Sequence, residues 1–137
     1  MATYTPNYGL HQWEAGDNFL RTDFNADFSK IDTALGSKAG LVTGSYTGDG
    51  KASQMISLGF TPRAVLLLLA TGHISYNGSR YGGLAFPDAP VTNDWEDASS
   101  GTTVLAIVEG GFQVYYDYDE DVFTNFGDYL FRYLALR

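Results

Sequence analysis

The chain has no cysteine and few basic residues. Without cysteine it can form no disulfide, thiolate metal site or cysteine nucleophile. Its 8 Lys and Arg residues are outnumbered by 16 Asp and Glu residues, which gives a net charge of −8. A surface this poor in cations is unsuited to neutralising phosphate or adhering to anionic lipid, so we expect no nucleic-acid partner and no membrane insertion.

Long apolar runs are also missing. No segment is apolar enough over a sufficient length to span a bilayer, and the N-terminus lacks the basic region followed by an apolar region that marks a signal peptide. We therefore expect no classical secretion. A protein of this kind would reach the outside of a cell by lysis or by assembly into a larger particle.

The residues that are abundant favour β-structure. Apolar residues make up 45% of the chain, and 10 Tyr, 9 Phe and 16 Gly suit short strands joined by tight turns. Residues 64–70, AVLLLLA, lie between turn signals at Gly59, Pro62 and Gly72. A run of this length without a polar residue predicts a central strand that is buried on both faces.

One segment has helical periodicity. In residues 17–35, Leu20, Phe24, Phe28, Ile31 and Leu35 follow spacings of 4, 4, 3 and 4 and line one face. Asp17 is a candidate N-cap, and Gly36 stands where a left-handed C-terminal residue belongs. A helix this short is marginal alone, so its apolar face must contact a partner. That partner is either the rest of the same domain or other copies in a bundle about a symmetry axis.

The remaining sequence divides around this helix. Residues 1–15 form an extended arm whose Tyr4, Tyr8 and Trp13 either cover the adjacent helix or dock on another chain. After the flexible joint 36–40, strands are expected at 41–46, 52–58, 64–70, 81–86, 102–108, 112–116 and 128–137. Hairpin turns are expected at Thr47–Gly50 and Asn77-Gly78. The sequence therefore predicts an arm and helix in residues 1–40 and an antiparallel β-sandwich in residues 41–137.

Candidate contact residues cluster in the expected loops of the sandwich. Asp117, Asp119 and Asp121 alternate as calcium ligands do, but Val122 replaces the glycine of an EF-hand loop, so at most a looser Ca²⁺ site is expected. Trp95, Tyr116, Tyr118 and Asp119 combine aromatic faces with a carboxylate, which suits a saccharide or a protein surface. Core or edge packing is the competing interpretation for each aromatic residue, as a solvated turn is for the aspartates.

Catalysis is the less favoured interpretation. His11 and His73 are the only histidines, and the sequence contains no nucleophile elbow, P-loop or dinucleotide fingerprint. A pair of carboxylates could serve a small cell-wall hydrolase, but so many aspartates identify no particular pair. We therefore expect a protein that is not an enzyme and needs no cofactor.

Three stretches together resemble bacteriophage tail-fibre and related virion appendage proteins. NYGLHQWEAGDNFLRTDFNADFSKIDTAL is similar to their N-terminal arm and helix, with an NYGL turn followed by Asn25-Ala26-Asp27 and Ile31-Asp32. GSYTGDGKASQMISLGFTPRAVLLLL is similar to their Gly-rich turn leading into an LGFTP-x-AV strand. NFGDYLFRYLALR is similar to their closing strand, with Phe131 departing from the usual pattern.

The resemblance implies a receptor-binding type of virion component, assembled in the host cytoplasm. It implies a homotrimer with Phe24, Phe28, Ile31 and Leu35 on the axis, and attachment to other virion proteins through residues 1–35. The sandwich would then contact a host-surface glycan or protein. The alternative within the same setting is a head-fibre or capsid decoration protein that has no specific receptor.

Overall fold

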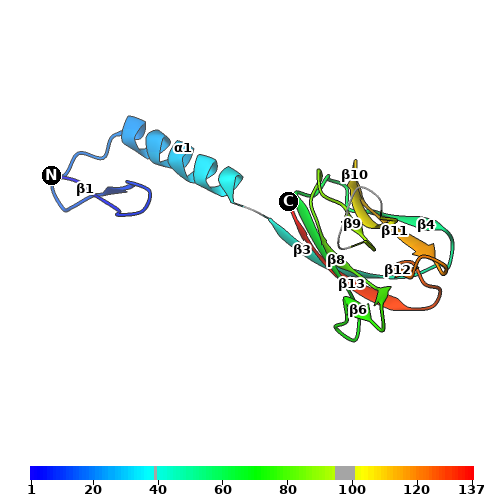
Figure 1. The fold of residues 1–137 in the computed structure, drawn as a ribbon. Helices are drawn as coiled ribbons and strands as arrows, with labels where there is room; N and C mark the ends of the chain where they lie inside the picture. The colour runs from blue at the N-terminus through cyan, green and yellow to red at the C-terminus, as the bar shows by residue number, and fades with distance from the viewer. Residues whose placement is uncertain (39, 95–100) are drawn as a thin grey trace. The chain divides into compact units, whose positions relative to one another are not determined.

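The computed structural model describes residues 1–38, 40–94 and 101–137, and the chain divides into two units, Met1–Ala39 and Gly40–Arg137. Unit 1 contains an arm and a helix, and unit 2 contains two β-sheets (Figure 1). The predicted fold class, mainly β with an N-terminal helix and a sandwich of antiparallel sheets, is confirmed.

Unit 1 is a two-stranded hairpin followed by a helix. Strands β1 (Thr3–Tyr4) and β2 (His11–Gln12) pair in antiparallel fashion, and helix α1 extends over Arg21–Ser37. The helix therefore begins after Asp17, and the N-cap prediction is wrong. The Asp17 carboxylate instead accepts the backbone N–H of Glu14 and lies 2.9 Å from the N-terminal ammonium of Met1. Gly36 is likewise inside the helix, so its predicted role as a left-handed terminator is wrong.

Unit 2 has one four-stranded sheet in the order β3-β13-β5-β8. Its strands are β3 (Leu41–Thr47), β13 (Leu130–Leu136), β5 (Ala64–Leu69) and β8 (Gly83–Ala85), and every pairing is antiparallel. The run of leucines is thus a central strand with a neighbour on each side, as predicted. The prediction that both of its faces are buried is wrong for unit 2, because only Val65 and Leu67 are fully buried and Leu66 and Leu68 on the other face are partly exposed.

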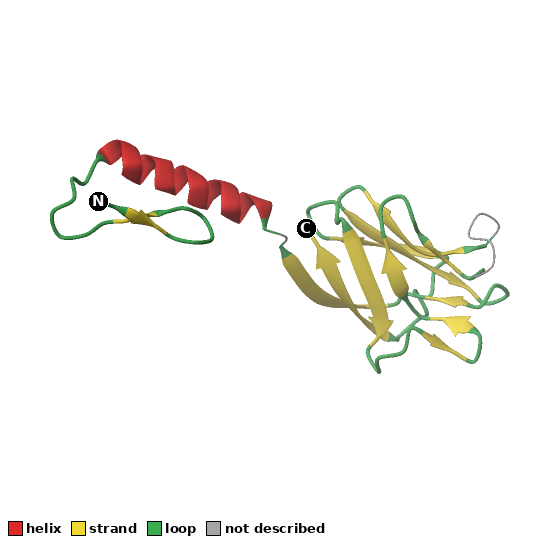
Figure 2. Cartoon of the chain, turned by 60° about the vertical axis from the view of Figure 1, so that its left-hand side comes forward, coloured by secondary structure: helices red, strands yellow, loops and turns green. Residues whose placement is uncertain are grey.

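The second sheet of unit 2 follows the order β6-β7-β12-β11-β10-β9, with β4 also paired to β11. These strands are β6 (Ser75–Tyr76), β7 (Ser79–Arg80), β12 (Val122–Phe123), β11 (Gly111–Asp117), β10 (Thr103–Val108), β9 (Val91–Thr92) and β4 (Ser53–Ser57). Figure 2 shows the two sheets facing each other as the layers of a sandwich.

The core lies between the facing sides of the two sheets. Val65, Leu67 and Phe131 of one sheet and Phe112 and Val114 of the other have no exposed surface. Alternation along each strand places these side chains on the same side, because successive residues point to opposite faces. In particular, Phe131 and Ala135 are buried whereas Leu130 is 44% exposed, which is the alternation that the sequence of β13 predicts.

The turn Thr47–Gly50 does not form the predicted hairpin. Strand β3 pairs with β13 and strand β4 pairs with β11, so this connection passes from one sheet to the other. The backbone N–H groups of Gly48 and Gly50 donate to the carbonyls of Tyr129 and Asn125. A Cβ on Gly48 would lie 2.1 Å from the Phe126 carbonyl oxygen, so this close crossing requires glycine. Asn77-Gly78 does form a hairpin, and both residues have the positive φ angles that its tight turn requires.

Candidate functional site

The apolar face of helix α1 is exposed. Phe24, Phe28, Ile31 and Leu35, the residues predicted to lie on an oligomer axis, are 41%, 56%, 38% and 63% exposed. Asp27 is the buried residue of this helix. Helices of soluble proteins ordinarily bury their apolar stripe and expose their charges, so unit 1 has the reverse arrangement. An exposed stripe of this kind marks an interaction surface.

The arm contacts the helix along the flank that carries Asp27 and Lys30, beside the apolar stripe. The Asp27 carboxylate accepts the backbone N–H of His11 at 2.7 Å, and its other oxygen lies 3.0 Å from His11 Nδ1. Lys30 Nζ donates to this carboxylate at 3.3 Å and also to the carbonyl of Gly9. Burial opposes ionisation of Asp27, but the hydrogen bonds from His11 and Lys30 hold the pKa of its carboxyl below the ordinary value. The contact therefore fixes the arm along the helix by charge-assisted hydrogen bonds.

A row of aromatic rings extends this contact onto the exposed stripe. Trp13 stacks on His11 with ring centroids 5.4 Å apart, and Phe19 follows at 4.7 Å from Trp13. Phe24 lies 5.6 Å from Phe19, and Phe28 lies 4.6 Å from Phe24. Of the two roles considered for residues 1–15, unit 1 shows contact with the adjacent helix. The exposed Tyr4 and Tyr8, at 58% and 50%, leave surface for a second chain.

The predicted acidic turn of unit 2, residues 117–121, lies at the end of the strands opposite Gly40, where the chain enters this unit. Strand β3 begins at Leu41 beside Leu136 and ends at Thr47 beside Leu130. The backbone N–H groups of Gly48 and Gly50 bond to Tyr129 and Asn125 at this far end. The turn between β11 and β12 lies at the same end, because β4, which pairs with β11, begins there. The acidic turn therefore faces away from the point of entry.

Two aspartates of this turn accept hydrogen bonds from the protein itself. Asp117 Oδ1 accepts the backbone N–H groups of Asp119 and Glu120, and Asp121 Oδ1 accepts the hydroxyl of Ser79. No group of three or more His, Asp or Glu side chains in residues 1–38, 40–94 and 101–137 could hold a metal ion. The side chains of Asp117 and Asp121 stabilise the turn, so the Ca²⁺ hypothesis has no geometric support.

The predicted aromatic contact residues have different surroundings. Tyr118 is 71% exposed at the turn, and Asp119 is exposed beside it. Tyr116 is half-buried and packs against Phe123 and Phe126 at 5.7 and 5.3 Å between ring centroids. Trp95 lies outside the described residues. Tyr118 and Asp119 are thus available for contact, whereas the ring of Tyr116 packs against Phe123 and Phe126 beneath the turn.

A second surface at this end was missed by sequence reasoning. An open groove of about 260 Å³ is lined by Leu69, His73, Tyr76, Tyr81 and Tyr129. Tyr76 and Tyr129 are 59% and 44% exposed. Burial raises the pKa of Tyr81, and nearby Tyr129, Asp121 and Tyr76 raise it further, so its hydroxyl stays protonated and can donate a hydrogen bond. The one signal in the sequence is Tyr76 next to the Asn77-Gly78 turn, and nothing local places Tyr129 opposite it.

Buried hydrogen bonds hold the loops at this end in place. Asn125 is fully buried, and its Nδ2 donates to Asp49 Oδ1 at 2.6 Å and to the Lys51 carbonyl at 2.8 Å. Its Oδ1 accepts the backbone N–H of Asp49 at 3.1 Å. Thr124, also fully buried, bonds to the backbone of Val104 and Tyr115. These bonds fix the 48–51 turn, and the Gly48 N–H of that turn donates to the carbonyl of Tyr129, which lines the groove. Recognition loops are usually held on a scaffold in this way.

Comparisons with known proteins identify no relative. No protein-family model, curated protein or solved structure matches this chain. No helix in the described part of the chain is long and apolar enough to cross a membrane.

Proposed function

We propose that this protein is a phage virion appendage component of the tail-fibre or receptor-binding type. The observation that carries the proposal is the exposed apolar stripe of α1 beside a buried Asp27. A helix with this arrangement is complete only when other apolar surface covers its stripe. The resemblance of the sequence to appendage proteins supplies the setting, because in those proteins such a helix assembles copies into trimers.

In the proposed assembly, Phe24, Phe28, Ile31 and Leu35 lie about the axis of a homotrimer. Their spacings of 4, 3 and 4 approximate the heptad repeat of a helical bundle. Fully burying one Phe, Ile or Leu side chain gains roughly 1.5–3 kcal/mol, so covering four half-exposed side chains favours association by several kcal/mol. The exposed rings of the arm add surface for other virion proteins. Residues 1–35 thus serve both assembly and attachment.

In the proposed mechanism, unit 2 presents its far end to the host surface. Exposed tyrosine rings can stack on the C–H faces of a sugar, while Asp119 and the tyrosine hydroxyls bond to its hydroxyl groups. Contacts of this kind are weak one at a time. Three copies held on one particle convert the later binding events into intramolecular ones, which raises the overall affinity without any new contact.

Adhesion is tested with a glycan array and the full chain. We expect binding to a defined saccharide class, lost in Tyr129→Ala and retained in the control Tyr4→Ala, whose ring lies in unit 1. Replacing Asp117, Asp119 and Asp121 by Asn keeps size and removes charge, and it shows whether the acidic turn contributes. Absence of binding to any glycan or host-cell preparation would favour the competing candidate, a head-fibre or decoration protein that has no specific receptor.

Attachment is tested by truncation. Deleting residues 1–15 removes the arm and its rings, so the shortened protein should keep a folded unit 2 but fail to incorporate into particles. Immunolabelling of intact particles measures this directly. Normal incorporation of the truncated protein would refute a role for the arm in attachment.

A further inference from the structure

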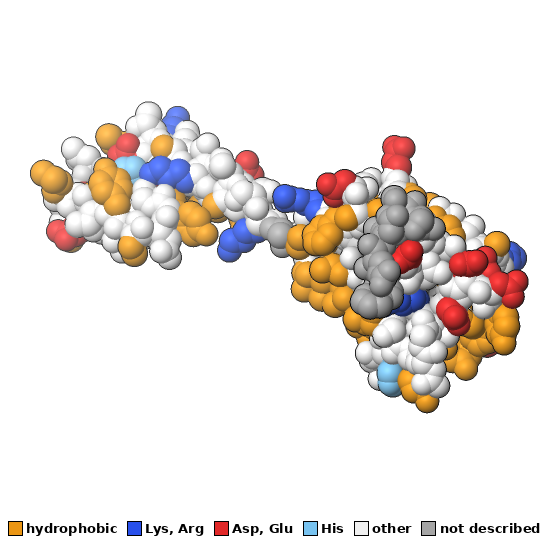
Figure 3. All heavy atoms as spheres, viewed as in Figure 1, with side chains coloured by type: hydrophobic (Ala, Val, Ile, Leu, Met, Phe, Trp, Pro, Cys, Tyr) orange, Lys and Arg blue, Asp and Glu red, His pale blue; other side chains and the backbone are white. Residues whose placement is uncertain are grey.

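The outer face of the four-stranded sheet is unusually apolar. Alternate residues of β13 and β5 point away from the core, and apart from Ala64 and Arg132 they are all leucines: Leu66, Leu68, Leu130, Leu134 and Leu136. Leu41 and Leu84, on the two edge strands, are 60% and 52% exposed. Hydrophobic side chains gather on the part of unit 2 that carries β3 and β8 (Figure 3). Sheets that face water on one side normally carry polar residues there.

The second sheet provides an internal comparison. The outer side of β4 carries Ser53, Met55 and Ser57, and the partner residues on β11 include Gln113 and Tyr115. This is the mixed, mostly polar surface expected of a solvated face. The outer face over β4 and β11 is therefore mixed, whereas β13 and β5 present mainly leucines outward. A run such as Leu66–Leu69 is typical of a strand covered on both sides.

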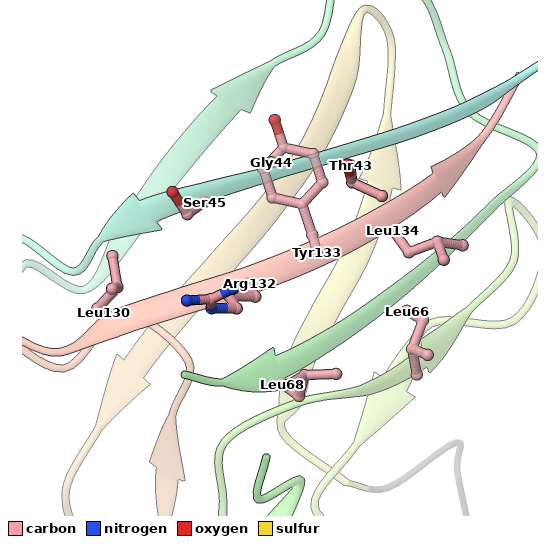
Figure 4. A pocket seen from close by; sticks show the side chains of 9 residues that line it. All are labelled: Thr43, Gly44, Ser45, Leu66, Leu68, Leu130, Arg132, Tyr133 and Leu134. Atoms are coloured by element: carbon pink, nitrogen blue, oxygen red, sulfur yellow. The ribbon is translucent and has the colours of Figure 1, made fainter. Parts of the chain in front are cut away.

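A hollow of about 480 Å³ opens on the leucine-rich face, with one cation in it. Side chains of β3, β13 and β5 surround the hollow, and Arg132 lies among Leu66, Leu68 and Leu134 (Figure 4). No described carboxylate lies within ion-pair distance of Arg132. An apolar hollow with a single unpaired guanidinium suits an apolar segment that carries a carboxylate.

The edge of the same sheet offers such a segment. From β8 onward the chain reads Leu84-Ala85-Phe86-Pro87-Asp88, with Leu84 and Phe86 52% and 44% exposed. Asp88 is exposed and has no described ion-pair partner. The hollow and this edge segment are therefore complementary. Both are apolar, and the hollow carries the cation Arg132 while the segment carries the anion Asp88. They lie on different parts of the surface of one copy.

We propose that the leucine-rich face is an interface between copies, in which Leu84 and Phe86 of one copy contact the hollow of the next and Asp88 pairs with that copy's Arg132. This inference rests on the proposed trimer, because the helices supply the high local concentration at which the contact forms. The contact joins two different patches, so it is heterologous and closes into a ring when the rotation is threefold.

Thiol labelling of the full chain tests the interface, because the chain has no cysteine of its own. Thr43, at the rim of the hollow, and Ser57, on the polar face, are both exposed strand residues. We expect a maleimide reagent to label Thr43→Cys at least tenfold more slowly than Ser57→Cys in the assembled protein. The two rates should become equal when Phe28→Asp is added to dissociate the helices.

Charge reversal tests the named pair. Arg132→Glu and Asp88→Lys should each raise the Thr43→Cys labelling rate severalfold, and the double variant should restore protection. Arg63→Glu and Glu109→Lys make the same changes of charge at exposed sites elsewhere and should have no effect.

A trimer in which Thr43→Cys and Ser57→Cys label equally fast would overturn this inference and leave the proposed function standing. A monomeric wild type would overturn the trimer itself. Protection that the double variant fails to restore would refute the Asp88–Arg132 contact.

Discussion

Units 1 and 2 use apolar side chains in opposite ways. Unit 2 buries Leu67, Phe112 and Phe131 completely between two sheets. Unit 1 exposes Phe24, Phe28 and Leu35 by 41–63% and buries a carboxylate. The comparison shows that unit 2 has a core of its own, whereas the helix of unit 1 depends on surface from outside. Assembly should therefore depend on unit 1 and folding stability on unit 2.

The largest expected effect is on assembly. Phe28→Asp places a charge in the middle of the stripe, where burial against other helices would leave it unpaired and costly. We expect complete dissociation, with the near-ultraviolet circular dichroism of unit 2 retained. Ser29→Asp, on the polar side of the same turn, is the matched control and should remain assembled.

The next effect is on the core of unit 2. Leu67→Ala deletes a fully buried side chain from the central strand β5, which should lower the free energy of unfolding by about 2–5 kcal/mol. Chemical denaturation of unit 2 measures this loss. Association through the helix should be unchanged at temperatures where unit 2 stays folded, and loss of association there would contradict the division of roles.

A smaller loss is expected from the buried amide at the far end of unit 2. Asn125→Ala leaves Asp49 N–H and the Lys51 carbonyl without their partner. These hydrogen bonds are partly buried, and each contributes roughly 0.5–1.5 kcal/mol, so we expect stability to decrease by about 1–3 kcal/mol. Glycan binding should weaken as well, because the loops beside the groove lose their support. A variant as stable as wild type would show that water replaces the amide.

The smallest effect is the acid response of unit 1. The pKa of Asp27 is lowered in the folded protein, so its hydrogen bonds stabilise the arm fully above the ordinary carboxyl value of 3.8 and less as the pH falls through the lowered value. The titratable and charged groups around it are His11, Lys30 and Asp23, whose carboxylate lies 3.9 Å from His11 Nε2. Trp13 fluorescence should report release of the arm below about pH 4. Asp27→Asn should abolish this transition.

Local patterns in the sequence predicted the elements better than their pairing. Period-two alternation put Phe131 and Ala135 on the face opposite to Leu130, because alternation depends on strand geometry alone. Which of the two faces is buried was shown only by the structure. The turn Thr47–Gly50 contains a strong hairpin signal, yet β3 and β4 join different sheets, since strand partners are chosen by contacts far along the chain. The helix starts later than predicted. The Asp17 carboxylate does not cap it, because it is bonded to the backbone N–H of Glu14 and to the N-terminal ammonium of Met1.

The candidate site was predictable only in part. The helix stripe follows directly from its spacing, and the exposed Tyr118 and Asp119 follow from turn chemistry. The groove unites Tyr76 and Tyr81 with Tyr129, residues that have no relation in sequence and meet only through the sandwich. Arg132 alternates with the buried residues of β13, so its outward direction was predictable. The position of Arg132 among the leucines of β5 was not predictable, because it depends on the register between β13 and β5.

The central claim is that the exposed stripe of α1 assembles the protein, and the mass of the wild-type chain in solution tests it most directly. Multi-angle light scattering at tens of micromolar should give three times the chain mass of 15.0 kDa, with dissociation only on strong dilution. At that concentration a complex with a micromolar Kd, about −8 kcal/mol, is largely formed. A mass of 15.0 kDa throughout the range would contradict the claim.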